Sequence, residues 1–392
     1  MSTKKTLKIP FTLPVQHKTI VGYTKTITPA GLQLISDISL KLGTPVNLHF
    51  SFGENACYLN LSGQVAFCTQ CGESASGAYE IQIKFSAIRE WEQMILVSAI
   101  EALKQSSPMQ EKSLVKIQVS RDTLALEAAQ LPGHTAEFHS TESPKGGKKR
   151  KGFTPHPPWV QDMNRHLEPY RNAILECRLV REASTGTLPV RKMRIWLIQL
   201  YPFIETFPKW IALNITKTYD ARSRGYMIDN VRVEKRHAEQ WMYMAQGFGI
   251  DPYVLCSIQP FPEVEALTHW LWSINTRGSL AEAVGATNYS IEGVTQGIAE
   301  STIKGFPYYD GRDGVRLDKK AYWWMEAHSR YDDIHPLQAL EVMKLYATTK
   351  ELQEKVVFAT QRSLEYFLLA LEACYNCDHT YEVKGAYASS EK

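Results

Sequence analysis

The chain has 392 residues, of which 44% are hydrophobic and 22% charged, so it carries enough apolar sequence to bury the cores of two or three domains. Its 44 basic and 41 acidic side chains give a net charge of +3, too near neutral to indicate a nucleic-acid partner. No apolar stretch approaches the roughly 20 residues of a membrane span, no signal-peptide core follows the basic N-terminus, and seven cysteines fit a reducing compartment. We expect a cytoplasmic protein.

Residues 1–105 are predicted to form a small β-barrel with a closing helix. Residues 46–52, 58–61 and 79–85 place apolar side chains two apart, which is the period of a strand. Glycine and polar clusters, such as residues 72–77, separate these runs and indicate turns. Residues 91–103 then form a mostly apolar stretch of helical length.

Residues 106–158 are predicted to be a basic, flexible linker. The segment Pro144-Lys-Gly-Gly-Lys-Lys-Arg-Lys-Gly152 has five basic residues in nine and almost no apolar side chain, so it cannot contribute to a core. A patch that binds nucleic acid or anionic lipid is the alternative, but the run lacks the interleaved aromatic residues that would stack on bases.

Residues 159–392 are predicted to form an all-α bundle with a short C-terminal tail. Long helical periods recur at residues 231–247, 262–275, 317–335 and 337–374, and glycine and proline separate them. No alternating stretch lies between them, which favours helices packed on helices.

The sharpest chemical motif is an H-x3-D-x2-H pattern in the helical region, formed by His328, Asp332 and His335. At 100° per residue, offsets of four and seven place all three side chains on one helical face. Imidazole and carboxylate are ligands that iron and other first-row metals accept. Pro336 follows directly and indicates a break or kink at that point.

A second motif, Glu234-x2-His237, lies in the predicted helical stretch 231–246 and also places its two side chains on one face. Di-metal bundles use such carboxylate and histidine pairs, opposed by ligands from other helices. A third helix would supply another carboxylate, and Glu292 and Glu300 are the two candidates. With three carboxylates and three neutral histidines as ligands, a charge of −3 would offset most of the +4 charge of two Fe²⁺ ions.

These residues resemble the ligand set of the haem-oxygenase-like diiron oxidases, whose helical fold is shared with thiaminase-like and pyrroloquinoline-quinone-synthase-like proteins. The resemblance covers about residues 165–375, and its spacing is similar to that of members that decarboxylate fatty acids, which favours Glu292 over Glu300. It implies that the catalytic and metal-binding residues are the six that follow: Glu234, His237, Glu292, His328, Asp332 and His335.

The resemblance also implies the chemistry. Two iron ions would activate dioxygen, the co-substrate, through a peroxo-diiron intermediate and oxidise a small organic substrate. Known family members act on fatty acids or amino acids, or make p-aminobenzoate from their own side chains. Tyr289, Lys304 and Tyr331 lie near the ligands in the sequence. The external reductant and the oligomeric state stay open, with a homodimer as one option.

The N-terminal region resembles a bacterial PilZ domain in the order of its predicted strands. The family binds cyclic di-GMP through R-x3-R ahead of [DN]-x-S-x2-G. Here the second motif is reduced to Thr26-x-Thr28-x2-Gly31, and no arginine precedes Arg89. Because arginine is the natural clamp for phosphate and guanine, we expect no cyclic di-GMP binding. The rival to an enzyme is thus a non-catalytic regulatory protein that keeps the fold and uses the PilZ-like domain to bind a partner.

Overall fold

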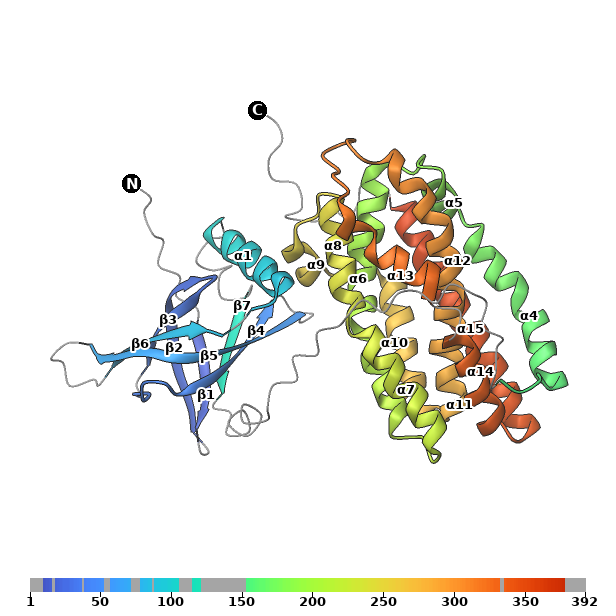
Figure 1. Cartoon of the computed structure of the whole chain (residues 1–392), viewed down its shortest axis with the longest axis horizontal. Coiled ribbons are helices and arrows are strands. Elements are labelled where there is room, and N and C mark those ends of the chain that lie inside the picture. The colour runs from blue at the N-terminus through green and yellow to red at the C-terminus, as the bar shows by residue number, and fades with distance from the viewer. Residues whose placement is uncertain are drawn as a thin grey trace. The chain divides into compact units, whose positions relative to one another are not determined.

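The structure is a computed structural model, and it describes residues 10–15, 18–36, 39–52, 57–71, 78–86, 88–105, 115–120, 153–331 and 335–377. The chain divides into two compact units, residues 1–147 and residues 148–392, called here the sheet domain and the helical domain (Figure 1).

The sheet domain is built from strands that pair in the order β1-β2-β3-β6-β5-β4-β7, with helix α1 after β6. The bounds are β1 Pro10–Val15, β2 Lys18–Thr28, β3 Gly31–Ser36, β4 Pro45–Phe52, β5 Cys57–Gln70, β6 Tyr79–Phe85, α1 Glu90–Gln105 and β7 Val115–Ser120. All neighbours in this order are antiparallel, and a short parallel pairing at Phe11↔Ile117 and Thr12↔Gln118 joins β1 to β7. A β-barrel with a closing helix was predicted for this region, and the structure confirms the coarser expectation, a small antiparallel sheet domain.

Alternation along the strands builds the core of this domain. Leu32 and Leu34 of β3 and Ile81 and Ile83 of β6 are buried, while intervening side chains of both strands are more exposed. This period of two is the one that the sequence predicted for β6. Gly31 is required where β3 meets β6, because a Cβ there would lie 2.2 Å from the backbone oxygen of Ile83.

Strand β7 corrects the predicted linker. It lies within residues 106–158, for which the sequence predicts a flexible linker, and it pairs antiparallel with β4 from Asn47↔Ser120 to Phe52↔Val115. The alternating apolar residues Val115, Ile117 and Val119 carry the strand signal. The basic run at 144–152 and the glycine-rich turn at 72–77 lie outside the described residues.

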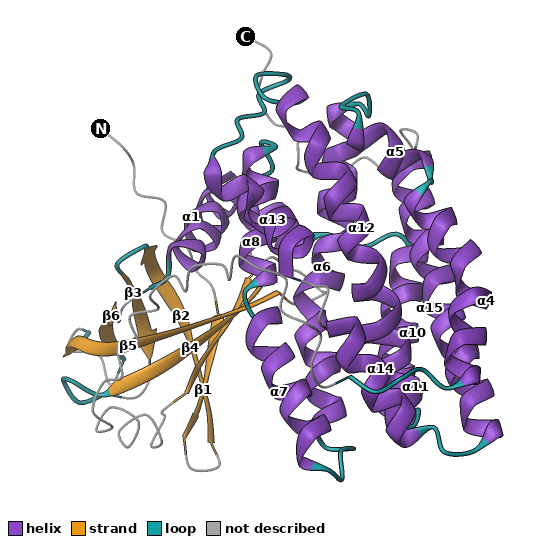
Figure 2. Cartoon of the chain, turned by 45° about the vertical axis from the view of Figure 1, so that its right-hand side comes forward, coloured by secondary structure: helices purple, strands orange, loops and turns teal. Residues whose placement is uncertain are grey.

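The helical domain contains the following elements: α4 Pro158–Leu175, α5 Arg178–Ser184, α6 Val190–Ile215, α7 Ala221–Glu234, α8 His237–Gly247, α9 Pro252–Ser257, α10 Pro262–Arg277, α11 Leu280–Val284, the π-helix η1 Gly285–Glu292, α12 Gly293–Thr302, the 3₁₀ helices η2 Ile303–Tyr308 and η3 Lys319–Tyr322, α13 Trp323–Tyr331, α14 His335–Tyr346 and α15 Lys350–Asn376. The expected all-helical architecture is confirmed over the described part of this domain (Figure 2).

Two long helices organise the bundle around its aromatic core. Helix α6 packs against α7, α8 and α10, and α15 packs against α4, α10 and η1. Trp196 and Trp210 of α6 are almost fully buried, and Phe203 stacks on Phe367 of α15 with ring centroids 5.8 Å apart. Across the described residues, no helix combines the length and the apolarity needed to cross a membrane.

Candidate metal centre

Glu234 and His237 lie at a junction between two helices. Helix α7 ends at Glu234 and α8 begins at His237, so the single helix expected over residues 231–246 was wrong. The junction is a turn of two exposed residues, Lys235 and Arg236, which carries neither glycine nor proline and therefore gave no signal in the sequence. Both Glu234 and His237 are buried, and Oε2 of Glu234 lies 2.6 Å from Nδ1 of His237.

Glu292 is the last residue of η1, a π-helix whose residues are all buried. Small residues allow this wider helix to pack closely, since a Cβ on Gly285 would lie only 3.0 Å from Cγ2 of Thr360. The Ser290 hydroxyl donates to the backbone oxygens of Gly285 and Thr360, at 2.9 and 3.0 Å, and so holds the π-helix against α15. Single π-turns occur frequently at functional sites, and this one ends at a buried carboxylate.

His328, in α13, is oriented by the turn that precedes it. Its Nδ1 lies 2.8 Å from the backbone oxygen of Trp324, and its ring stacks on the Trp324 indole with centroids 3.8 Å apart. Because a carbonyl oxygen can only accept, Nδ1 carries the proton and the Nε2 lone pair is left for a metal. The His328 ring also lies 4.3 Å from the ring of His237, measured between centroids.

His335 begins α14, and Pro336 occupies the first turn of that helix, where a proline is tolerated. Its Nδ1 lies 3.3 Å from Oε2 of Glu292. Residues 332–334, which include Asp332, lie outside the described residues. The shared helical face expected for His328, Asp332 and His335 therefore stays a prediction.

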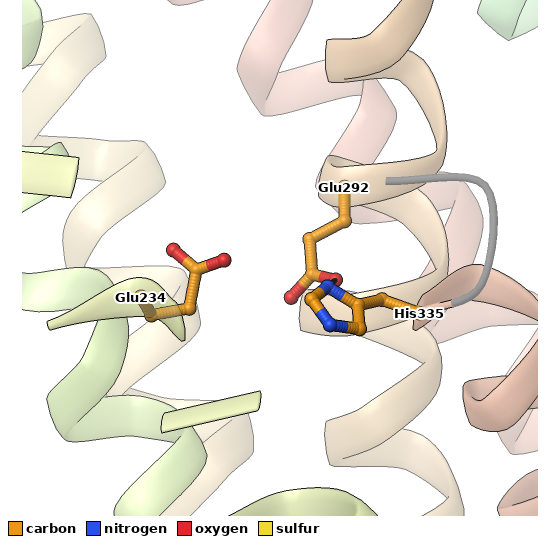
Figure 3. Close-up of side chains that lie close together, drawn as sticks. All are labelled: Glu234, Glu292 and His335. Carbon is orange, nitrogen blue, oxygen red and sulfur yellow. Dashed lines mark ion pairs between the residues drawn. The ribbon is translucent and has the colours of Figure 1, made fainter. Parts of the chain in front are cut away.

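Three of these side chains converge on one point. Glu234, Glu292 and His335 each offer a ligand atom, and the three atoms lie within 4.8 Å of one another. Figure 3 shows the two carboxylates turned towards each other, with the His335 ring beside Glu292. All three residues are less than a tenth exposed. Two carboxylates at this distance, removed from water, attract a cation strongly.

Burial sets the protonation of the surrounding groups. It raises the pKa of Glu234 well above its usual value, and the nearby Glu292 carboxylate adds to that shift. Burial also lowers the pKa of His237 to about 4 and holds the pKa of His328 well below its ordinary value. Both imidazoles are therefore neutral at pH 7, which is the form that binds a metal ion.

A narrow cavity of about 40 Å³ adjoins the cluster. Glu234, His237, Glu292 and His328 form its polar end. The other residues that line it are, with one exception, aromatic or aliphatic: Trp196, Leu200, Phe203, Ile204, Phe207, Trp241, Ile291, Thr295, Ile298, Trp324 and Phe367. No lysine or arginine is among these lining residues, so none of them would balance the carboxylates.

The structure thus brings together five of the six predicted ligands, and the sixth, Asp332, is not described. Of the two glutamates that the sequence left open, Glu292 joins the cluster, whereas Glu300 is exposed and accepts a hydrogen bond from Gln296. Tyr289 is buried and donates to Asn164. Lys304 is exposed, and the side chain of Tyr331 is not among those described.

Two asparagines beside Glu292 were missed from the sequence. Asn230 of α7 and Asn288 of η1 are 2% and 1% exposed, and both donate to the Glu292 carboxylate. The signal was an N-x3-E spacing that occurs before both carboxylates, as Asn230-x3-Glu234 and Asn288-x3-Glu292. On a helix, this spacing places an amide one turn before each acid.

Known proteins that are similar to this chain include iron-containing enzymes, which agrees with a metal site at the buried cluster. Residues 194–367 match the family described as iron-containing redox enzymes, and residues 5–102 match the PilZ domain. A solved structure, a TenA homologue from Pseudomonas syringae pv. tomato, superposes with a TM-score of 0.53 at 29% identity, over 57% of this chain and 98% of that chain.

Two curated relatives are named 4-aminobenzoate synthase. The protein from Chlamydia trachomatis is 25% identical over 208 residues, which are 50% of this chain and 87% of that protein. The protein from Chlamydia muridarum is 22% identical over 216 residues, 53% of this chain and 89% of that protein. The predicted resemblance is therefore confirmed as a match of residues 194–367 to iron-containing redox enzymes and of residues 5–102 to the PilZ domain.

Proposed function

We propose that the helical domain is an oxidoreductase that holds two iron ions at the buried cluster and uses dioxygen to oxidise a small organic substrate. The convergence of Glu234, Glu292 and His335 within 4.8 Å, at the polar end of an apolar cavity, carries this proposal. The match to iron-containing redox enzymes supports iron as the metal.

The donor set suits iron. Carboxylates and neutral imidazoles are hard and borderline ligands that bind Fe²⁺. Glu234, Glu292 and His335 would hold an ion at the point where their ligand atoms meet, and His237 and His328 would contribute to a second ion together with Asp332. Bound iron would supply one-electron redox chemistry and a place for dioxygen to react. With Asp332 included, the three carboxylates would offset three of the four positive charges of two Fe²⁺ ions.

The surrounding residues hold the ligands ready. The Trp324 carbonyl fixes the His328 tautomer that has its lone pair on Nε2, the form that would bind a metal. The aromatic and aliphatic walls exclude bulk water, and they bind a substrate through apolar contact. Thr295 supplies the one hydroxyl among the lining residues, and it donates to the backbone oxygen of Ile291 at 2.7 Å.

The names of the two chlamydial relatives suggest 4-aminobenzoate as the first product to seek. The family resemblance leaves three kinds of substrate open: a fatty acid, an amino acid, and a side chain of the protein itself, from which 4-aminobenzoate would be made. The decisive test starts from the purified full chain loaded with Fe²⁺ without oxygen. The loaded protein is mixed with a metabolite extract, air and a reductant, and oxygen uptake is followed. Mass spectrometry then looks for new products in the extract and for a change in the mass of the intact protein.

Three outcomes decide the proposal. Oxygen uptake and a new product in the parent, lost in Glu292→Gln and kept in the matched control Glu300→Gln, support it. Iron binding without any uptake or product favours the non-catalytic regulatory protein. Activity that survives in Glu292→Gln as in Glu300→Gln would show that the oxidation takes place elsewhere.

A further inference from the structure

The Glu292 carboxylate is held asymmetrically. Its Oε1 accepts from Nδ2 of Asn288 at 2.8 Å and from Nδ2 of Asn230 at 3.1 Å. Its Oε2 has a longer contact of 3.3 Å with the same Asn230 nitrogen, and it lies 3.3 Å from Nδ1 of His335. A carboxylate oxygen has two lone-pair directions, so the two amides occupy Oε1 and leave Oε2 as the oxygen that faces the cluster.

The choice of amides matters for charge. An arginine or lysine at either position would also satisfy Glu292, but it would cancel the negative charge that attracts a cation. An amide orients the carboxylate and adds no charge. Asn230 approaches from α7, and Asn288 lies one turn before Glu292 on η1, so the carboxylate is held both from its own helix and from a neighbouring one.

The two asparagines are costly residues for a core. Neither Oδ1 atom has a hydrogen-bond partner among the described residues, although both side chains are buried. A buried acceptor without a partner costs about 1–3 kcal/mol, and a leucine of similar size would avoid this cost. Packing alone would therefore favour leucine at both positions, whereas the hydrogen bonds to Glu292 require an amide.

We propose that Asn230 and Asn288 are positioning residues, which hold Oε1 of Glu292 and present Oε2 to the metal. This inference rests on the proposed function, because it assigns the two residues a role at the same metal centre. Hydrogen-bond partners of metal ligands commonly contribute a factor of about 10–100 to metal affinity. Asn288, with the shortest contact, should contribute more than Asn230.

The test is an anaerobic titration of the full chain with Co²⁺, read from its visible d–d absorption, and with Fe²⁺, read from the metal retained. The variants are Asn288→Leu and Asn230→Leu. The matched control is Asn214→Leu, because Asn214 is fully buried and donates at 2.6 Å to Asn275, and it also has an unpartnered Oδ1 among the described residues. Thermal unfolding of each metal-free variant measures its effect on the fold separately.

We expect Asn288→Leu to raise the Kd of at least one bound Co²⁺ ion by about 10-fold or more relative to the parent, and to change the d–d spectrum. Asn230→Leu should have the same effects to a smaller degree. Asn214→Leu should keep the affinity and spectrum of the parent whatever its unfolding temperature. Should Asn288→Leu fail to fold, the same comparison with Asn230→Leu decides. Variants that bind as the parent does would overturn the positioning role and leave the proposed function standing, whereas a parent that binds no metal would overturn both.

Discussion

Replacing Glu234 by glutamine should stabilise the metal-free protein and abolish its response to metal. Glu234 and Glu292 offer ligand atoms within 4.8 Å of each other, and two unit charges at that distance repel by about 3 kcal/mol at an effective dielectric constant of about 20. Glu234 relieves part of this repulsion by taking up a proton, since burial raises its pKa. We therefore expect the free energy of unfolding of metal-free Glu234→Gln to exceed that of the parent by about 1–2 kcal/mol at pH 8. Each kcal/mol should raise Tm by about 2–4 °C.

The sign of the pH dependence follows from the same shift. A carboxyl group whose pKa is raised on folding stabilises the protein below its unfolded pKa, and this contribution is lost as the pH rises through the folded pKa. The advantage of Glu234→Gln over the parent should thus be small at pH 5 and grow towards pH 8. The histidines near the cluster are common to both proteins and cancel in the difference to first order.

The assay is urea unfolding followed by helical circular dichroism at pH 5 and pH 8, first with a chelator and then with Mn²⁺ under anaerobic conditions. Metal should stabilise the parent by RT ln(1 + [M]/Kd) and leave Glu234→Gln unchanged, while the exposed-site control Glu300→Gln should follow the parent. A Glu234→Gln variant that is less stable than the parent without metal at pH 8 would show that the two carboxylates do not repel as expected, and one that gains as much stability from metal as the parent would show that Glu234 is not a ligand.

Three further predictions test other parts of the structure. Because burial lowers the pKa of His237 to about 4 from its ordinary 6.5, this side chain alone should contribute about 3 kcal/mol of stability to the metal-free protein at pH 7 that is lost by pH 4. The loss of stability between pH 7 and pH 4 in urea unfolding should therefore be smaller by about that amount in His237→Gln than in the parent, and an equal loss in both proteins would contradict the prediction. Gly305→Ala should lower Tm strongly, since its Cβ would lie 1.9 Å from the backbone oxygen of Ala183, whereas Gly225→Ala in α7 has no atom within 4 Å and should raise stability by about 0.5–1 kcal/mol. Calorimetric titration with cyclic di-GMP should give no heat, and micromolar binding would contradict the reading of its reduced motif.

Much of the fold follows from periodicity in the sequence. The apolar alternation at residues 79–85 predicted β6, and the apolar run at 91–103 predicted α1, because burial on one face imposes these periods on any chain. Strand β7 was missed because its short alternation lies in a polar, proline-containing region that resembled a linker as a whole.

The residues of the candidate metal centre could be proposed from residue type and spacing, but the backbone that carries them could not be predicted. The spacing of Glu234 and His237 indicated one helix, and the structure divides them between α7 and α8. The π-helix that carries Glu292 depends on contacts of Gly285 and Ser290 with α15, which is far away in the sequence. The amide of Asn230 could be related to Glu292 only once α7 and η1 were placed in space.

We propose that buried carboxylates and imidazoles of the helical domain hold two iron ions. The most direct measurement is the iron content of the full chain after anaerobic loading and removal of free metal, with the two ions resolved by Mössbauer spectroscopy. We expect about two Fe per chain in the parent, and fewer or none when His335 or Glu292 is replaced. Protein that retains no iron, manganese or zinc while all the predicted ligands are intact would contradict it.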